Sequence, residues 1–345
     1  MRVLLTAHVD HFTIGLARSL SKYLSVTVTG VRPALIRYLR DFLRIKQNLI
    51  IFPSSSGKLS SAINLALLKS LTPLNDVVHA NTSLSGLYCG SIEKLVVTEH
   101  GCPSPAHHLR EASALIKLGS LGVPIVAISK YTESLLRKFY GIKAYKVIYH
   151  GVIEEFFYKP RCFPLRRPVR ILYVSRLEES KEPLVFINAL NKLQNTINFK
   201  AYLRGDGPLK NYIKSLIVKY NLTSRVRLIP RLPFKTLIKL YRYADIFIHT
   251  NSTEPFGLVV LEAMASALPV IVPNSGGASE IAGNAAIKFI PKDYTDLVEK
   301  IVSVVTNAQL YETLSYNSYK HAKIFSWDKA AYEYIRIYKK VLYND

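Results

Sequence analysis

The sequence contains few cysteines and no long apolar run. Three of its 345 residues are cysteine, Cys89, Cys102 and Cys162, and they lack the paired spacing of a disulfide framework or a zinc site. We therefore expect free thiols, a cytoplasmic location and no metal site. No stretch reaches the roughly 18 uncharged apolar residues that a membrane span needs. Residues 1–6 are typical of a buried strand, so we expect no secretion signal there.

Acidic residues are also scarce. The chain has 24 Asp and Glu against 46 Lys and Arg, which gives a formal charge of +22. An excess of this size indicates a polyanionic partner, for which a nucleotide, an anionic lipid and a nucleic acid are all candidates. The charge alone does not distinguish among them.

The order of apolar segments indicates the fold class. Short runs that are apolar throughout alternate with longer amphipathic segments, as expected for parallel strands covered on both faces by helices. This pattern predicts an α/β protein with two Rossmann-like, doubly wound parallel-sheet domains. The expected strands lie at 2–6, 25–29, 49–52, 76–79, 94–98, 124–128, 145–149, 169–175, 199–203, 226–229, 245–249, 268–272 and 286–290.

The two series of strands meet in a segment rich in proline and positive charge. Residues 159–168 contain three prolines and four cations, a composition typical of a linker. We expect an N-terminal acceptor-side domain at 1–160 and a C-terminal nucleotide-sugar-binding domain at 168–325. A terminal helix at 326–345 is expected to pack back on the N-terminal domain. Two such open sheets would face a central cleft, with ligands at the carboxyl ends of their strands.

Two phosphate-binding motifs are incomplete. Residues 54–58 resemble the end of a P-loop, but Phe52 and Leu59 occupy positions that require Gly and Ser or Thr. Gly205–Gly207 begins like a dinucleotide fingerprint, but Lys210 replaces the third glycine. A tight turn after a strand explains Gly205–Gly207 equally well.

The most informative segment is 251–265. Its expected strand at 245–250 is followed by Glu254 on a loop, a helix that begins near Gly257, and Glu262 in that helix. A carboxylate accepts hydrogen bonds from two neighbouring hydroxyls, which suits a ribose or hexose diol; complementing the helix dipole is the alternative role. Unpaired backbone N–H groups at a helix start can bind an anion or sugar oxygens, and here they belong to Phe256, Gly257 and Leu258.

This segment resembles the signature of retaining glycosyltransferase family four, in which two glutamates are separated by seven residues. The resemblance continues through residues 268–281 and includes Ser175-Arg176-Leu177, Lys181, Gly205-Asp206-Gly207-Pro208 and the helix that follows Phe325-Ser326-Trp327. It covers about 168–340 strongly and the N-terminal half weakly.

The resemblance implies the GT-B fold, a nucleotide diphosphate sugar as donor, and no bound metal or other cofactor. Glu262 would hold the ribose hydroxyls, and Glu254 would lie near the transferred sugar and the diphosphate. Arg176 and Lys181 would bind the diphosphate and stabilise the charge that develops on it, as a divalent cation does elsewhere. Gly205 and Leu232 complete the expected nucleotide-binding set.

In the N-terminal half, His100 follows an expected strand and resembles the histidine with which the family contacts the transferred sugar. Retention could proceed by attack on the same face of the sugar, with the leaving phosphate taking the acceptor proton. The first loop, 7–15, lacks the paired glycines of many members, which leaves Gly15 or the backbone near His11 for a phosphate contact.

The acceptor-side half of the sequence contains a basic amphipathic segment of its own. Residues 32–46 form an expected amphipathic helix with Arg37, Arg40 and Arg44 on one face. Such a helix can lie on an anionic leaflet, or it can be an ordinary surface helix packed on its own sheet. We expect a glycan or lipid-linked acceptor and a peripheral position on the inner membrane face.

The sequence therefore favours a metal-independent, retaining hexosyltransferase. A soluble sugar-phosphate synthase or a phosphorylase of the same fold is the first alternative. A basic nucleic-acid-binding protein is the second, and it is disfavoured because no recognition module is evident and the cations are spread over both domains.

Overall fold

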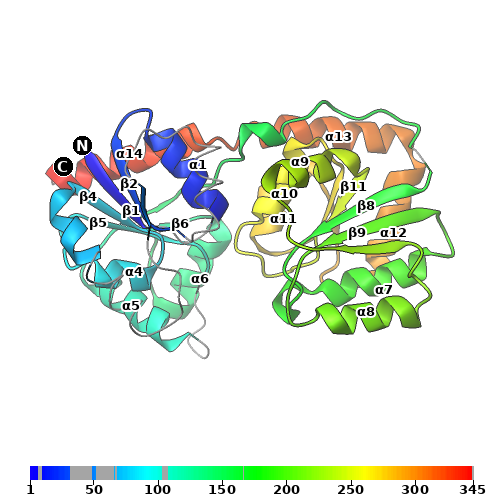
Figure 1. Cartoon of the computed structure of the whole chain (residues 1–345), viewed down its shortest axis with the longest axis horizontal. Coiled ribbons are helices and arrows are strands. Elements are labelled where there is room, and N and C mark those ends of the chain that lie inside the picture. Colours follow the sequence, from blue (N-terminus) through cyan, green and yellow to red (C-terminus); the bar gives the residue numbers. More distant parts are fainter. Residues whose placement is uncertain are drawn as a thin grey trace. The chain divides into compact units, whose positions relative to one another are not determined.

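The apolar runs of the sequence form two parallel sheets in a computed structural model, which describes residues 1–6, 10–31, 49–51, 66, 68–102, 108–165 and 167–343. Packing divides the chain into two units (Figure 1). The N-terminal unit consists of Met1–Gly151 and Ser326–Asp345, and the C-terminal unit is Val152–Phe325.

The N-terminal unit contains a sheet of seven parallel strands in the order β3-β2-β1-β4-β5-β6-β7. The side chains of β1, β4 and β5 are buried at almost every position, which explains why these strands are apolar without alternation. The strands are β1 (Arg2–Thr6), β2 (Ser25–Val31), β3 (Leu49–Ile51), β4 (Val77–Ala80), β5 (Leu95–Glu99), β6 (Ile125–Ala127) and β7 (Lys146–Val147).

Helices cover this sheet, and the last one comes from the end of the chain. Helix α14 packs against α1, and two of its tyrosine hydroxyls contact side chains of the sheet. Tyr338 Oη lies 2.6 Å from His79 Nδ1, and Tyr334 Oη lies 2.8 Å from Thr98 Oγ1. The described helices are α1 (Asp10–Leu20), η1 (Thr72–Leu74), α4 (Ser83–Tyr88), α5 (Leu109–Ser120), α6 (Lys130–Tyr140) and α14 (Trp327–Tyr343).

The C-terminal unit contains a sheet of six parallel strands in the order β10-β9-β8-β11-β12-β13. The strand order reverses between β8 and β11. In such sheets the loops diverge at this point and leave room for a ligand beyond the carboxyl ends of the strands. The strands are β8 (Val169–Val174), β9 (Phe199–Arg204), β10 (Val226–Ile229), β11 (Ile246–Ile248), β12 (Val270–Pro273) and β13 (Ile287–Phe289).

Helices lie on both faces of this second sheet, with α7, α8 and α12 on one face and α9, α10 and α13 on the other (Figure 1). The core beneath α7 and α12 is built from buried side chains such as Phe186, Phe199 and Ile301. The helices are η2 (Glu154–Phe156), η3 (Glu179–Lys181), α7 (Pro183–Leu193), α8 (Lys210–Lys219), α9 (Phe234–Tyr243), α10 (Leu258–Ala265), α11 (Gly276–Ala282), η4 (Gly283–Ala285), α12 (Tyr294–Thr306) and α13 (Ala308–Ala322).

Every strand from β1 to β13 overlaps one of the expected runs, and the prediction of two doubly wound parallel sheets is confirmed. The boundary between the units differs from the expected one. It lies after Gly151, because Phe156 packs against Phe234 and Tyr241, and the Tyr158 N–H donates to Ala265 O.

The proline-rich segment at 159–168 belongs to the C-terminal unit. The Arg161 guanidinium donates to the carbonyl oxygens of Tyr241, Arg242 and Ser266, and Phe163 packs against Tyr311. These contacts hold the segment on the unit that follows it. The expected helix at 32–46 and the P-loop-like residues 54–58 lie outside the described residues.

Candidate active site

The candidate residues of the C-terminal unit gather where the strand order reverses. Arg176 and Lys181 follow β8, and Glu254 follows β11, the neighbouring strand. Because β8 and β11 are parallel, the loops after them leave the same edge of the sheet. This edge is where a doubly wound sheet binds its ligands.

Two glycines allow the loop that carries Glu254 to pack closely on α11. The Gly277 N–H donates to Glu254 O at 2.6 Å, and a Cβ at Gly277 would lie only 2.1 Å from Pro255 O. Gly276 has a φ of +74°, a left-handed conformation that favours glycine. The sequence Ser275-Gly276-Gly277 therefore fixes the backbone of the Glu254 loop.

The carboxylate of Glu254 is held through one oxygen. Its Oε2 accepts hydrogen bonds from Lys181 Nζ at 3.0 Å and Asn251 Nδ2 at 2.7 Å, and His249 Nε2 lies 3.8 Å away. Among the described side chains, the hydrogen bonds and ion pairs to this carboxylate are all on Oε2. The Glu254 side chain is 18% exposed, so Oε1 can accept a hydrogen bond from a ligand.

The electrostatics of this cluster favour an ionised Glu254. Burial raises the pKa of Glu254, but the charge of Lys181 and the hydrogen bonds from Lys181 and Asn251 outweigh burial, so its pKa is lowered from the usual value. Burial lowers the pKa of His249 to about 4, and the nearby Glu254 only partly offsets this. At neutral pH the cluster is a carboxylate, an ammonium and a neutral imidazole.

Glu182 joins the loop that follows β8 to the loop that follows β11 by hydrogen bonds. Glu182 accepts hydrogen bonds from Ser252 Oγ at 2.6 Å and from the Ser252 N–H at 3.3 Å. The carbonyl of Lys181 accepts from Tyr173 Oη and Thr250 Oγ1, both at 3.1 Å. Hydrogen bonds from β8 and from the end of β11 thus hold the backbone of Lys181 in place. This positions the Lys181 ammonium against Glu254.

Arg176 has a different environment. Its side chain is 73% exposed, and its guanidinium forms an ion pair with Glu178 at 2.8 Å. An exposed pair of this kind contributes little to stability and separates easily. The guanidinium can therefore turn to a ligand without breaking buried structure.

Glu262 lies in α10 and is almost completely buried, with 2% exposure. Tyr241 Oη in α9 donates a hydrogen bond to Glu262 Oε2 at 2.9 Å. Burial and the negative charge of Glu262 raise the pKa of Tyr241 well above its usual value, so the hydroxyl keeps its proton. Arg204, at the end of β9, adds a positive charge nearby: burial lowers its pKa, and Tyr241 and Glu262 offset part of that effect.

The remaining candidates of this unit lie on the loops around α10 and after β9 and β10. Phe256 is buried, and Gly257 caps α10 with a φ of +93°. The first two N–H groups of α10 belong to Leu258 and Val259 and have no acceptor within the helix, whereas the Val260 N–H donates to Gly257 O. Gly205 passes so close to β8 that a Cβ would lie 2.0 Å from Ser175 O, and Leu232 is half-buried before α9.

In the N-terminal unit, His100 follows β5 at the carboxyl edge of the sheet. Its ring lies 4.2 Å from that of Phe12 and 5.3 Å from that of His150, measured between centroids. The neighbouring Glu99 is buried, and burial raises its pKa to about 8. His100 therefore occupies an aromatic environment beside a carboxyl group that is largely protonated at neutral pH.

Gly15 has a packing role that the sequence does not indicate. It lies within α1, and a Cβ at this position would lie 2.2 Å from the ring of Trp327 at the start of α14. We therefore assign Gly15 to the docking of α14 on α1 rather than to a phosphate contact.

The geometry adds residues that the sequence reasoning missed: His249, Asn251, Glu182, Tyr241 and Arg204. His249 and Asn251 could have been found, because they flank the end of an expected strand just before Glu254. Tyr241 and Glu182 could not, because their partners lie 21 and 70 residues away in the chain.

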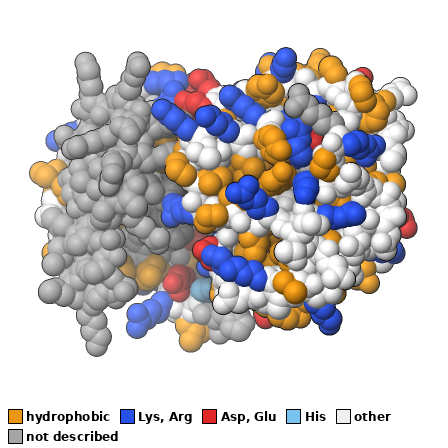
Figure 2. Space-filling model, turned by 45° about the vertical axis from the view of Figure 1, so that its right-hand side comes forward, with side chains coloured by type: hydrophobic (Ala, Val, Ile, Leu, Met, Phe, Trp, Pro, Cys, Tyr) orange, Lys and Arg blue, Asp and Glu red, His pale blue; other side chains and the backbone are white. Residues whose placement is uncertain are grey.

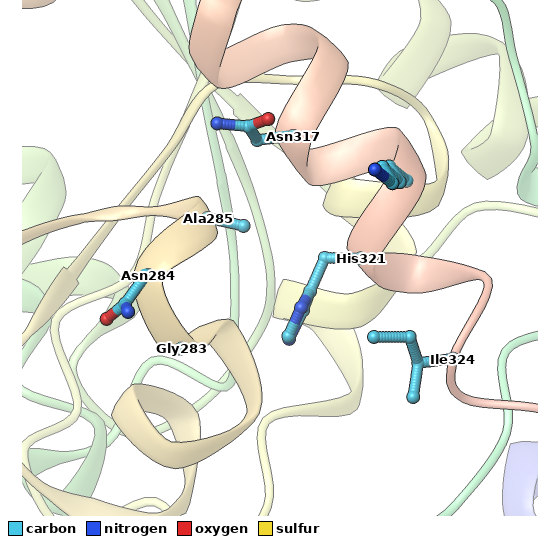
Figure 3. A pocket seen from close by; sticks show the side chains of 7 residues that line it. Gly283, Asn284, Ala285, Asn317, His321 and Ile324 are labelled. Carbon is cyan, nitrogen blue, oxygen red and sulfur yellow. The ribbon is translucent and has the colours of Figure 1, made fainter.

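A separate cavity of about 600 Å³ lies between η4 and α13 (Figure 3). His321, Asn317 and Ile324 line it on one side and Gly283–Ala285 on the other, and His321 Nε2 lies 2.8 Å from Ile281 O. None of the candidate residues lines this cavity.

Within the described ranges, no cluster of three or more His, Cys, Asp or Glu is arranged to hold a metal ion, and no helix is long and apolar enough to cross a membrane. Cys89, Cys102 and Cys162 form no disulfide bond.

Residues 164–321 match the family model of glycosyl transferases group 1. The matched segment lies within the C-terminal unit and includes every candidate residue described above except Gly15 and His100. Among curated proteins, an uncharacterized glycosyltransferase of Methanocaldococcus jannaschii is 31% identical over 219 residues, which cover 63% of this chain and 59% of the relative. A probable sucrose-phosphate synthase of Thermosipho melanesiensis is 36% identical over 111 residues, or 31% of this chain and 26% of the relative.

The matched parts cover 59% and 44% of the length of the first two curated relatives. Solved structures resemble the chain over its whole length. A glycosyltransferase from Rickettsia africae has a TM-score of 0.80 and 22% identity, and the match covers 100% of this chain and 99% of that one. HepE of Anabaena, in complex with UDP and glucose, has a TM-score of 0.80 and 20% identity, covering 99% and 100%. The expected GT-B fold with two Rossmann-like domains is thereby confirmed.

Proposed function

We propose that this protein is a retaining glycosyltransferase of family four that transfers a hexose from a nucleotide diphosphate sugar to an acceptor. The observation that carries the proposal is the pairing of Lys181 with Glu254 beyond the ends of β8 and β11, with Glu262 in the helix that follows. It lies within the segment that matches the group 1 glycosyltransferases.

Each side chain has a role that its environment supports. Glu262 would accept hydrogen bonds from the ribose hydroxyls of the donor. Glu254, anchored on Oε2, would offer Oε1 to a hydroxyl of the transferred sugar. The first N–H groups of α10 would bind the diphosphate or sugar oxygens, and Gly205 and Leu232 would border the nucleotide.

The cations would supply the charge that the reaction needs. When the bond from the anomeric carbon to the diphosphate oxygen breaks, the electron pair leaves with the nucleotide diphosphate. An ammonium has three N–H donors, and Lys181 uses one on Glu254, so others can reach a phosphate oxygen. Arg176 would join it by leaving Glu178, and together they would stabilise the departing charge.

Transfer would then proceed on one face of the sugar. The acceptor hydroxyl would form the new bond to the anomeric carbon on the face that the diphosphate leaves, and its proton would pass to the departing phosphate oxygen. This sequence retains the configuration and requires no protein base, so His100 would act as a sugar ligand. We propose that no metal ion takes part, because Arg176 and Lys181 provide the positive charge.

A screen of nucleotide sugars tests this proposal. The purified protein is incubated in EDTA with UDP-, GDP- and ADP-hexoses, and the released nucleoside diphosphate is measured together with the anomeric configuration of the product. We expect release from one donor, beginning with UDP sugars because HepE was solved in complex with UDP and glucose. Activity that is lost in EDTA and restored by magnesium or manganese would contradict metal independence.

We further propose a glycan or lipid-linked acceptor at an anionic membrane surface on the cytoplasmic side. The support is the charge of +22, which is visible on the face in Figure 2 as many Lys and Arg side chains among few acidic ones. Vesicles with and without anionic lipid test this, and binding should weaken at physiological salt, where charges are screened over roughly 8 Å. Transfer to a free sugar phosphate without vesicle binding would favour the synthase alternative.

A further inference from the structure

Tyr241 and Glu262 form a buried hydrogen bond that no part of the proposed reaction yet uses. Tyr241 is 0% exposed and Glu262 is 2% exposed, and the hydroxyl lies 2.9 Å from Oε2 of the carboxylate. A carboxylate in such a position must be hydrogen-bonded, because burial of an unpaired charge is strongly unfavourable. The tyrosine hydroxyl therefore supplies a hydrogen bond that a buried carboxyl group needs, and it helps to fix the position of Oε2.

The tyrosine is well suited to act as a fixed anchor. Its ring packs edge-on against Phe156 at 5.4 Å and stacks on Phe247 at 5.8 Å. Phe247 belongs to β11 and Phe156 to η2, so the Tyr241 ring contacts both the sheet and the segment that precedes the sheet in the chain. A ring held on two sides keeps its hydroxyl in one place, which limits the rotamers open to Glu262.

We propose that Tyr241 is a positioning residue that fixes the Glu262 carboxylate in the orientation that receives the ribose hydroxyls of the donor. The inference rests on the proposed function, since it presupposes a nucleotide donor. Tyr241 would not touch the ligand and would act only through Glu262. Its contribution should therefore depend on whether the ligand carries ribose hydroxyls.

Tyr241→Phe removes this contact, together with the longer one of 3.4 Å from the hydroxyl to Val259 O, and keeps the packed ring. The chain offers a matched control in Tyr311→Phe. Tyr311 is also 0% exposed, and its hydroxyl donates at 3.0 Å to the carbonyl of Asp245, just before β11 begins. That position is at the amino end of β11, whereas Glu254 follows the carboxyl end of the same strand.

The experiment measures the affinity of the wild type and both variants for UDP, GDP and ADP and for their 2′,3′-dideoxy forms by calorimetry. We expect Tyr241→Phe to weaken binding of the preferred ribonucleotide roughly tenfold, because a hydrogen bond to a charged group is lost, and to leave its dideoxy form unaffected. Tyr311→Phe should change neither. For each variant, the affinity for the ribonucleotide is compared with the affinity for its dideoxy form. A general loss of stability lowers both affinities alike and therefore cancels in the ratio.

Two further measurements separate the possible failures. With Glu262→Gln already in place, adding Tyr241→Phe should cause no additional ribose-dependent loss, since the tyrosine acts through the carboxylate. An equal loss for the ribose and dideoxy ligands, or no loss, would overturn the positioning role while leaving the proposed function standing. A wild type that binds none of the six nucleotides would overturn both.

Discussion

Removal of the Lys181 ammonium provides a specific test of the cluster around Glu254. Lys181→Met keeps most of the length of the side chain but removes its charge. Glu254 would then retain Asn251 as its hydrogen-bond donor, with a neutral His249 nearby. Burial would no longer be outweighed, and the carboxylate would be less stable in the folded protein.

The expected size follows from the distance and the exposure of the pair. At 3.0 Å, two unit charges attract each other by about 5 kcal/mol at an effective dielectric constant of about 20. Removing one partner of a fully buried pair costs roughly 3–5 kcal/mol. Because Lys181 and Glu254 keep 22% and 18% of their side-chain exposure, we expect less than this, about 2–3 kcal/mol of unfolding free energy at pH 7.

The effect should depend on pH with a definite sign. The folded-state pKa of Glu254 is lowered in the wild type, so its stabilising contribution is present above the unfolded pKa and is lost as the pH falls through the folded pKa. In Lys181→Met, burial would raise that pKa above the unfolded value. The deficit of the variant should therefore shrink as the pH falls from 7 towards about 4, where Glu254 of the variant is protonated.

Urea denaturation of the wild type, Lys181→Met, Glu254→Gln and the double variant at pH 7 and pH 4.5 measures this. The double variant should recover a large part of the stability that Lys181→Met loses, with a coupling free energy of about 2 kcal/mol at pH 7. A deficit that is the same at both pH values, together with additive effects of the two substitutions, would refute the reasoning.

Further predictions concern other parts of the site. Arg176→Ala should reduce turnover by about a hundredfold while changing the unfolding free energy by less than about 0.5 kcal/mol, and unchanged kinetics would remove it from the diphosphate site. Glu262→Ala should mainly raise the KM for the donor, whereas Glu254→Ala should also lower kcat; identical profiles would contradict their separate roles. Gly277→Ala should abolish donor binding, because its Cβ would lie 2.1 Å from Pro255 O, and a thermal-shift assay with the nucleotide would reveal unaltered binding if this is wrong.

The strands and the order of the two sheets could be predicted because both depend on local pattern. Runs such as 124–128 and 268–272 are apolar throughout, and they form β6 and β12, whose side chains are all buried. The loop of Glu254 and the start of α10 were equally accessible, since Pro255 and Gly257 mark a turn before a helix.

The side-chain pairings could not be predicted, because they join residues that are distant in sequence. Lys181 meets Glu254 across 73 residues only because β8 and β11 are neighbours in the sheet. The boundary after Gly151 depends on the packing of Phe156 against α9. The amino-acid composition of the segment does not indicate this contact. The expected roles of Arg176, Lys181, Glu254, Glu262 and His100 stay predictions.

The most direct measurement is a calorimetric titration of the purified protein, in EDTA, with the nucleotide sugar that gives the largest thermal shift. The proposed function predicts one donor bound per chain in the wild type and binding that is strongly weakened in Glu262→Ala. It also predicts that Glu254→Gln binds the donor but transfers its sugar slowly. Absence of binding by every nucleotide sugar, or binding that is unchanged in Glu262→Ala, would contradict a donor site between the ends of β8 and β11 and the start of α10.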